Sequence, residues 1–194
     1  MSKKLILVLA IIGVLMFGAA SLVKPDSNSK EKPAEVQLSL NDMVGKPAPD
    51  FSLQNQRGET FKLSAMSGKK TILFFNEGIM CYPACWNQMA ALGKDVRLNN
   101  DTVVSASVVV DSPANWASAF KKMPELSSGT ILFDSDKSLS TGYGMLSLAS
   151  SMHKGSMPGH TYIIVDENRI VRYTLDDPKM SIQNEVLVNE LSKI

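Results

Sequence analysis

The sequence has few cysteines and no excess of charge of one sign. Twenty basic residues stand against nineteen acidic ones among 194, so the formal net charge is +1. No basic stripe and no interleaving of basic with aromatic residues occurs, and we therefore expect no nucleic-acid partner. The only two cysteines, Cys81 and Cys85, both lie in the stretch "FFNEGIMCYPACWNQM". This stretch is the first candidate for a functional site.

A long hydrophobic run lies at the N-terminus. Residues 5–23, "LILVLAIIGVLMFGAASLV", are uncharged and follow two lysines. A run of about 20 apolar residues matches the thickness of a bilayer, and the lysines are expected on its cytoplasmic side. We therefore expect residues 1–23 to form a single-pass anchor in the cell membrane, with the rest of the chain extracytoplasmic. The alternative is a signal sequence cleaved near the small residues 18–20, which would give a secreted protein.

The predicted anchor is followed by a segment with the composition of a flexible tether. Residues 24–37, "KPDSNSKEKPAEVQ", are charged, contain proline and serine, and include few large apolar side chains. Residues 38–194 remain, and this length suits one domain with its own core, since domains cluster near about 100–150 residues.

Two periodicities alternate along this domain. Strand-like apolar runs occur at residues 71–75, 102–110, 130–133, 161–165 and 170–174. Helical spacing fits between them, at Met89, Leu92 and Val96, in the segment that Pro113 opens, and at Leu187, Leu191 and Ile194. Strands that alternate with helices predict an α/β domain whose sheet is covered on both faces.

The cysteines follow a predicted buried strand and begin the next helix. A helix N-terminus offers free N–H groups and a partial positive charge, and both favour a thiolate. Pro83 suits the first helical turn, and Tyr82 and Trp86 can shield the sulfur from water. Side chains four apart on a helix hold their Cβ atoms about 5–6 Å apart, whereas a disulfide needs about 3.5–4.5 Å. We therefore expect Cys81 in the loop and Cys85 in the first turn of the helix.

The pair has three possible roles: redox chemistry, metal binding, or a structural role as a disulfide or as two inert buried thiols. A disulfide that closes so short a loop stabilises little, because the stabilisation grows with loop length. The structural role therefore explains the pair poorly, and we favour redox or metal chemistry.

Four stretches in order along the chain are similar to one family. They are "GKPAPDFSLQNQRGETFKLSAMSGKKTILFF", "SVVVDSPANWASAF", "ILFDSDKSLSTGYGM" and "HTYIIVDENRIVRY". Together they resemble the redoxin, or peroxiredoxin-like AhpC/TSA, branch of the thioredoxin superfamily. The resemblance implies a thioredoxin-like fold with a central mixed sheet flanked by helices. It also implies a thiol-dependent oxidoreductase that reduces small peroxides or protein disulfides with electrons from an unidentified thiol donor, without a further cofactor.

The resemblance also implies roles for the residues around the cysteines. Cys85 matches the reactive position of the family, with Pro83 before it and Gln88 after it at the family's spacing. Cys81 would be its partner in a disulfide. A plain comparison with thioredoxins instead makes the loop residue Cys81 the attacking thiol, and this alternative stays open.

The site departs from the family at three positions. Tyr82 stands where the family has threonine or serine, Gly78 stands where it has proline, and His160 stands on the strand expected to contribute an arginine. A neutral imidazole orients and stabilises a peroxide oxygen less well than a guanidinium does. We expect His160 to stabilise the Cys85 thiolate or relay a proton, or else to be a hydrogen-bonded histidine at the end of a strand.

A second resemblance concerns metal. Sco-type copper proteins bind copper through a Cys-x-x-x-Cys and a later histidine at the start of a strand, which "CYPAC" and "HTYIIV" match. Cys81, Cys85 and His160 would then be the ligands, and two thiolates with an imidazole suit copper. Copper binding and delivery is the alternative function. A sensor or interaction domain with dispensable thiols is a third.

The loop "SMHKGSMPGH" leads to His160 and is rich in methionine. Such a loop can supply soft metal ligands or cover an apolar site. Within it, Pro158 is similar to the cis-proline that faces the cysteines in thioredoxin folds, and we expect it to support the site.

Overall fold

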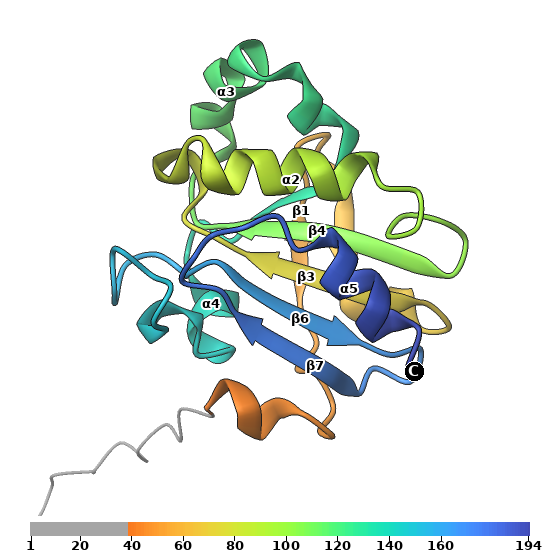
Figure 1. Ribbon diagram of the computed structural model, residues 1–194. Helices are drawn as coiled ribbons and strands as arrows, with labels where there is room; N and C mark the ends of the chain where they lie inside the picture. The colour runs from red at the N-terminus through yellow and green to blue at the C-terminus, as the bar shows by residue number, and fades with distance from the viewer. Residues whose placement is uncertain (1–38) are drawn as a thin grey trace, which may run out of the picture. The chain divides into compact units, whose positions relative to one another are not determined.

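A five-stranded mixed sheet forms the centre of the computed structural model, which describes residues 39–194 (Figure 1). The strand order is β5-β4-β3-β6-β7, with β3, β4 and β5 parallel and both β6 and β7 antiparallel to their neighbours. The strands are β3 (Lys70–Phe75), β4 (Val103–Val109), β5 (Ile131–Phe133), β6 (Thr161–Val165) and β7 (Val171–Asp176). All five predicted strand-like runs are confirmed, and so is the α/β class with a mixed sheet.

Helices and short turns connect the strands, and a separate hairpin precedes them. The hairpin consists of β1 (Ser52–Gln54) and β2 (Thr60–Lys62). The helices are α2 (Ala84–Lys94), α3 (Ala117–Lys122), α4 (Ser138–Gly142) and α5 (Asn184–Leu191). The 3-10 turns are η1 (Leu40–Met43), η2 (Leu63–Met66), η3 (Gly78–Cys81), η4 (Pro113–Trp116), η5 (Pro124–Ser128) and η6 (Met145–Ser147).

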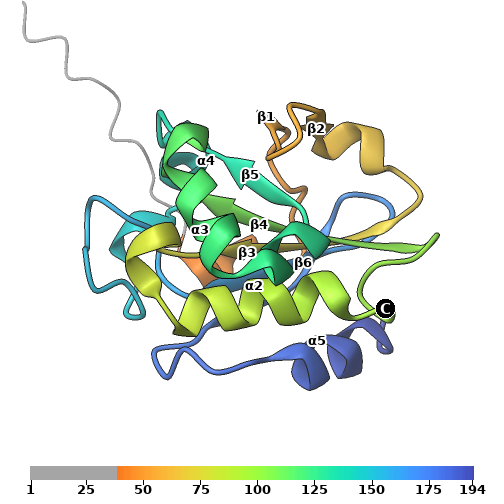
Figure 2. The ribbon, with the colours of Figure 1, turned by 90° about the horizontal axis from the view of Figure 1, so that it is seen from above.

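Successive side chains of the strands build two cores. Ile72 and Phe74 of β3 belong to the core beneath α2 and α5, whereas Leu73 and Phe75 belong to the core on the other face, with α4 and the hairpin. Figures 1 and 2 show α2 and α5 together on one face of the sheet, and α4 and the hairpin on the other. The alternation follows from the period of two along a strand. The prediction that the sheet is covered on both faces is confirmed.

Two predicted helices end earlier than the apolar spacing indicated. The Asp95 carboxylate accepts a hydrogen bond from the backbone N–H of Arg97, and this bond forms a turn after α2. Val96 therefore lies beyond the helix and is 76% exposed. Ile194 likewise lies beyond α5. The segment opened by Pro113 forms a 3-10 turn before the short helix α3.

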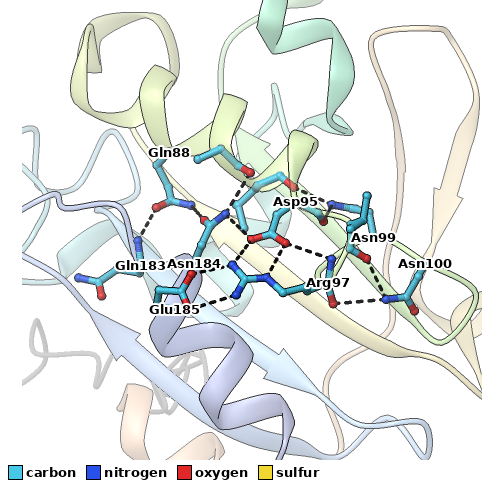
Figure 3. Close-up of polar contacts among 11 residues, drawn as sticks. Gln88, Asp95, Arg97, Asn99, Asn100, Gln183, Asn184 and Glu185 are labelled. Carbon is cyan, nitrogen blue, oxygen red and sulfur yellow. Dashed lines mark hydrogen bonds and ion pairs between the residues drawn. The ribbon is translucent and has the colours of Figure 1, made fainter.

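A polar network joins α2 to the start of α5 (Figure 3). Gln88 Nε2 donates to Asn184 Oδ1 at 2.9 Å, and the backbone N–H of Gln183 donates to Gln88 Oε1 at 2.7 Å. Asn184 also donates to the Asp95 carboxylate at 3.0 Å, and Arg97 pairs with the same carboxylate at 2.8 Å. The hydrogen bond from Arg97 lowers the pKa of Asp95 to about 2. The network therefore fixes where the chain enters α5.

The predicted anchor, residues 1–23, and the predicted tether, residues 24–37, lie outside the described residues. Within residues 39–194, no helix has the length and apolar character needed to cross a membrane.

Candidate functional site

Strand pairing brings three separate segments to one end of the sheet. Phe75, the last residue of β3, pairs with Thr161, the first residue of β6, and Thr161 pairs with Asp176, the last residue of β7. The segment after β3 contains both cysteines, the segment before β6 ends at His160, and the segment after β7 leads to α5. The sheet register therefore places the histidine beside the cysteines although 75 positions separate His160 from Cys85.

The two cysteines form a disulfide across the start of α2. Cys81 is the last residue of η3 and Cys85 the second residue of α2, with a Cα–Cα distance of 5.3 Å. Cys85 is fully buried, whereas Cys81 is 8% exposed. The expected positions, one cysteine before the helix and one in its first turn, are confirmed. Pro83 directly precedes the helix as its N-cap residue.

Hydrogen bonds hold the turn that contains Cys81. The Asn76 side chain accepts the N–H of Gly78 at 2.9 Å, and the Asp111 carboxylate accepts the N–H of Ile79 at 3.1 Å. Trp86 Nε1 donates to the Gly78 carbonyl at 3.1 Å. Gly78 has φ +59°, and a Cβ atom there would overlap the Asp111 carboxylate. The glycine that departs from the family pattern is therefore required by this local packing.

His160 faces the sulfur of Cys85. Its Nδ1 lies 3.5 Å from Cys85 Sγ, and its Nε2 lies 3.2 Å from the Ser181 carbonyl oxygen and 2.8 Å from the Tyr162 hydroxyl. A carbonyl oxygen only accepts, so the Ser181 contact is a hydrogen bond in the tautomer with the proton on Nε2; in that tautomer the Tyr162 hydroxyl also accepts from Nε2 and the Nδ1 lone pair faces the sulfur. When the disulfide is reduced, Nδ1 is therefore placed to accept the proton of the Cys85 thiol.

Burial keeps this imidazole neutral. His160 is fully buried, and its ring meets the edge of Phe74 at a centroid distance of 4.6 Å. Desolvation by burial lowers the pKa of His160, while the negative charge of Asp177 acts in the opposite direction. The neutral ring is thus the dominant form at neutral pH, as a general base requires.

The segment between β7 and α5 contacts both cysteine and histidine. Met180 Sδ lies 3.8 Å from Cys81 Sγ, and the next residue, Ser181, accepts from the His160 ring. Asp177 holds this segment, because its carboxylate accepts the N–H of Ser181 at 2.9 Å. Sequence reasoning missed Met180, Ser181 and Asp177. The turn-forming "DDPK" before Met180 was the available signal.

Glu77 fastens the methionine-rich loop to the cysteine turn. Its carboxylate is 2% exposed and accepts the N–H groups of Met152 and His153 at 2.6 and 3.0 Å. His153 Nδ1 lies 3.1 Å from the same carboxylate. Sequence reasoning missed Glu77 as well.

Pro158 is buried in the methionine-rich loop.

The expectation that Pro158 follows a cis peptide bond is wrong. Within residues 39–194, the cis bond joins Tyr82 to Pro83. Pro83 lies between the 3-10 turn η3 and α2, directly before the helix.

The aromatic residues near the disulfide have different environments. Trp86 is buried, whereas Tyr82 is 49% exposed and meets the edge of Trp86 at 4.9 Å. Lys122 Nζ lies 3.6 Å above the Tyr82 ring. Gln88 is bonded to Gln183 and Asn184 at the start of α5, as Figure 3 shows, and its part in the chemistry stays a prediction.

The same site offers ligands for a soft metal. One ligand atom from each of Cys81, Cys85 and His160 lies within 4.8 Å of the others. Two sulfurs and an imidazole nitrogen fit copper by chemistry. The sulfurs are bonded to each other, so the pair must be reduced before it can bind a metal.

Fold and site together define a class of protein. A thioredoxin-like sheet with a cysteine pair at the start of the helix after β3 fits a thiol-dependent oxidoreductase. Residues 44–174 match the AhpC/TSA family, and the chain belongs to this family.

Similar proteins extend over most of the chain. Peroxiredoxin Bcp of Escherichia coli is 29% identical over 156 residues, which cover 77% of this chain and 96% of that protein. Among solved structures, the reduced 2-Cys peroxiredoxin of Plasmodium vivax has a TM-score of 0.63 at 23% identity, covering 77% and 80% of the two chains. Peroxidoxin BcpB of Mycobacterium tuberculosis has a TM-score of 0.62 at 17% identity, covering 78% and 97%. The solved structures support the same fold.

The lowered pKa of His160 predicts a pH dependence of stability. In an unfolded chain, imidazole titrates near pH 6.5. Below about pH 6.5 the unfolded chain therefore binds more protons than the folded one, and the stability of the oxidised protein falls as the pH falls. Between pH 7 and pH 5, we expect the wild type to lose more free energy of unfolding than His160→Gln does.

Urea unfolding of both oxidised proteins at several pH values measures this difference. The titrating groups that do not interact with His160 are common to the two proteins, so their contributions cancel in the comparison; the contribution of Asp177, whose charge acts on His160, does not. Parallel pH profiles would show that the folded chain does not hold His160 neutral.

Proposed function

We propose that this protein reduces small peroxides with Cys85 as the nucleophile and Cys81 as the resolving thiol. The observation that supports this most directly is His160 Nδ1 at 3.5 Å from Cys85 Sγ, in a ring whose other nitrogen is bonded to a carbonyl. Cys81 Sγ instead contacts Met180 Sδ at 3.8 Å, although a ring nitrogen of His160 also lies within 4.8 Å of it. Cys85 also lies in the first turn of α2, where the free N–H groups stabilise a thiolate.

The proposed cycle has two steps that balance. The Cys85 thiol passes its proton to His160, and the thiolate attacks a peroxide oxygen; the O–O bond breaks, the leaving oxygen takes the proton as an alcohol or water, and Cys85 becomes a sulfenic acid. The Cys81 thiol then attacks the Cys85 sulfur, the sulfenic hydroxyl leaves as water, and the disulfide forms. A thiol donor restores both thiols.

Burial favours a small oxidant at Cys85. A fully buried sulfur excludes large substrates, whereas Cys81 is 8% exposed. Protein disulfides are the second substrate class, and their reduction would begin at Cys81. The two classes therefore predict different attacking cysteines.

Single cysteine variants test this assignment. After reduction, Cys81→Ser treated with one equivalent of hydrogen peroxide should accumulate a sulfenic acid, because its resolving thiol is absent. Cys85→Ser should react at least about tenfold more slowly, since Cys81 lies before α2 rather than in its first turn and contacts Met180 Sδ rather than His160 Nδ1. Dimedone labelling with mass spectrometry measures both. Faster labelling of Cys85→Ser would assign the attack to Cys81.

We also propose that the domain is anchored outside the cytoplasm. The uncharged run at residues 5–23 after two lysines supports this topology. Protease added to spheroplasts should digest the domain while a cytoplasmic marker remains intact. Protection of both proteins would contradict the proposed topology.

Copper binding is the second candidate function, supported by the three ligand atoms within 4.8 Å. Copper bound there would be held by Cys81, Cys85 and His160. If copper is the physiological cargo, the reduced wild type should bind one Cu(I) at least about tenfold more tightly than His160→Gln, because one of three ligands is removed. Competition with a Cu(I) chelator measures the ratio. Equal affinities would show that His160 is not a copper ligand and that the cysteines bind copper only as an ordinary dithiol does.

A further inference from the structure

Met180 places a thioether sulfur against the cysteine pair. Its Sδ lies 3.8 Å from Cys81 Sγ, and the side chain is partly buried against the core beneath α2. Two sulfur ligands of one tetrahedral metal ion, each bonded at about 2.3 Å, lie about 3.8 Å apart. The distance between the two sulfurs therefore fits a shared soft metal ion.

The backbone at Met180 is strained. Its φ is +51°, in the left-handed region that residues other than glycine seldom adopt. The Asp177 carboxylate holds this turn, because it accepts the N–H groups of Lys179 and Ser181 at 3.0 and 2.9 Å. The Asp177 carbonyl accepts the N–H of Met180 itself at 3.0 Å. Strain that the surrounding structure maintains in this way is concentrated at functional sites, so the turn points to a role for Met180.

The same turn connects Met180 to the histidine. Ser181 follows Met180, and its carbonyl oxygen lies 3.2 Å from His160 Nε2. Cys81, Cys85 and His160 each offer one ligand atom within 4.8 Å of the others. Figures 1 and 2 show the segment between β7 and α5 beside the start of α2. Met180 therefore approaches the three ligand atoms from a segment of its own.

We propose that Met180 Sδ is the fourth ligand of a Cu(I) site formed with Cys81, Cys85 and His160. The inference rests on copper binding, the second candidate function, and adds a ligand that the cysteine spacing and the histidine did not indicate. Thiolate and thioether sulfurs are soft ligands that select Cu(I), whereas Zn²⁺ is bound by cysteine, histidine and carboxylate. Met180 therefore makes the site selective for Cu(I) over Zn²⁺.

Copper enters this site only after the disulfide is reduced. A dithiol supplies two electrons and two protons: the Cys81–Cys85 bond breaks, both cysteines become thiols, and the dithiol leaves as a disulfide. Each cysteine then releases its proton when its sulfur binds Cu(I). His160 Nδ1 and Met180 Sδ bind through lone pairs and have no proton to release.

Metal titrations of the full-length chain, reduced and kept without oxygen, test the proposal. Competition with chelators measures the affinities for Cu(I) and for Zn²⁺. Met180→Leu keeps an apolar side chain of similar volume and removes the sulfur. We expect its Cu(I) affinity to fall at least about tenfold from that of the wild type, while its Zn²⁺ affinity changes by less than about twofold. Unchanged Cu(I) affinity, or an equal loss for both metals, would overturn the proposal.

Two exposed methionines provide matched controls. Met80 directly precedes Cys81, and the backbone N–H of Met152 is bonded to Glu77 before the cysteine turn. Their side chains are 60% and 75% exposed, so neither is packed on the sulfurs as Met180 is. Met80→Leu and Met152→Leu should bind Cu(I) with wild-type affinity. A loss in these variants as large as in Met180→Leu would contradict a specific ligand.

X-ray absorption at the copper edge tests the bond directly. When the chain is produced with selenomethionine and loaded with Cu(I), the wild type should show one selenium neighbour for each copper ion. This neighbour should be absent in Met180→Leu and present in Met80→Leu. A wild-type spectrum without selenium would overturn the assignment of Met180.

His160→Gln separates this proposal from the function on which it rests. If the wild type binds Cu(I) no more tightly than His160→Gln and shows no selenium neighbour, copper binding at this site is itself wrong, and the Met180 ligand with it. If His160→Gln binds Cu(I) more weakly than the wild type but Met180→Leu does not, only the assignment of Met180 is wrong.

Discussion

The site depends on the pairing of three strand ends at one edge of the sheet. Phe75 pairs with Thr161 and Thr161 with Asp176, so the segments that follow β3, precede β6 and follow β7 leave the sheet together. A shift of one residue in this register would turn His160 to the opposite face of the sheet. The two buried cores, which require alternate side chains of β3 to face opposite ways, hold the register against such a shift. Core packing therefore determines the distance between imidazole and sulfur.

The contacts around His160 connect that geometry to acid–base chemistry. The Ser181 carbonyl selects the tautomer, and burial lowers the pKa, so the free lone pair faces Cys85. Ser181 is in turn held by Asp177, and the entry to α5 is held by the network around Gln88. A polar network that lies away from the cysteines thus helps to fix the position of the Ser181 carbonyl oxygen at the site.

The local features of the site were predictable from sequence, and the long-range ones were not. The spacing of Cys81 and Cys85 excluded a shared regular helix and so predicted their positions. His160 was identified through resemblance to known sites. Met180 was missed because only strand pairing brings it to Cys81, and Glu77 was missed because its partners, Met152 and His153, lie 75 and 76 positions away. The end of α2 was misplaced for a similar reason, since a side-chain turn at Asp95 overrides apolar spacing.

The departures from the family pattern become coherent when they are considered together. Gly78 permits the close approach of Asp111, which fixes the turn that presents Cys81. An arginine at position 160 would supply a permanent charge, whereas a buried imidazole supplies a proton acceptor. In the proposed cycle, a resolving thiol four residues before the nucleophile lets the disulfide form without movement of a distant segment. Proton transfer through His160 then replaces charge stabilisation by arginine in that cycle.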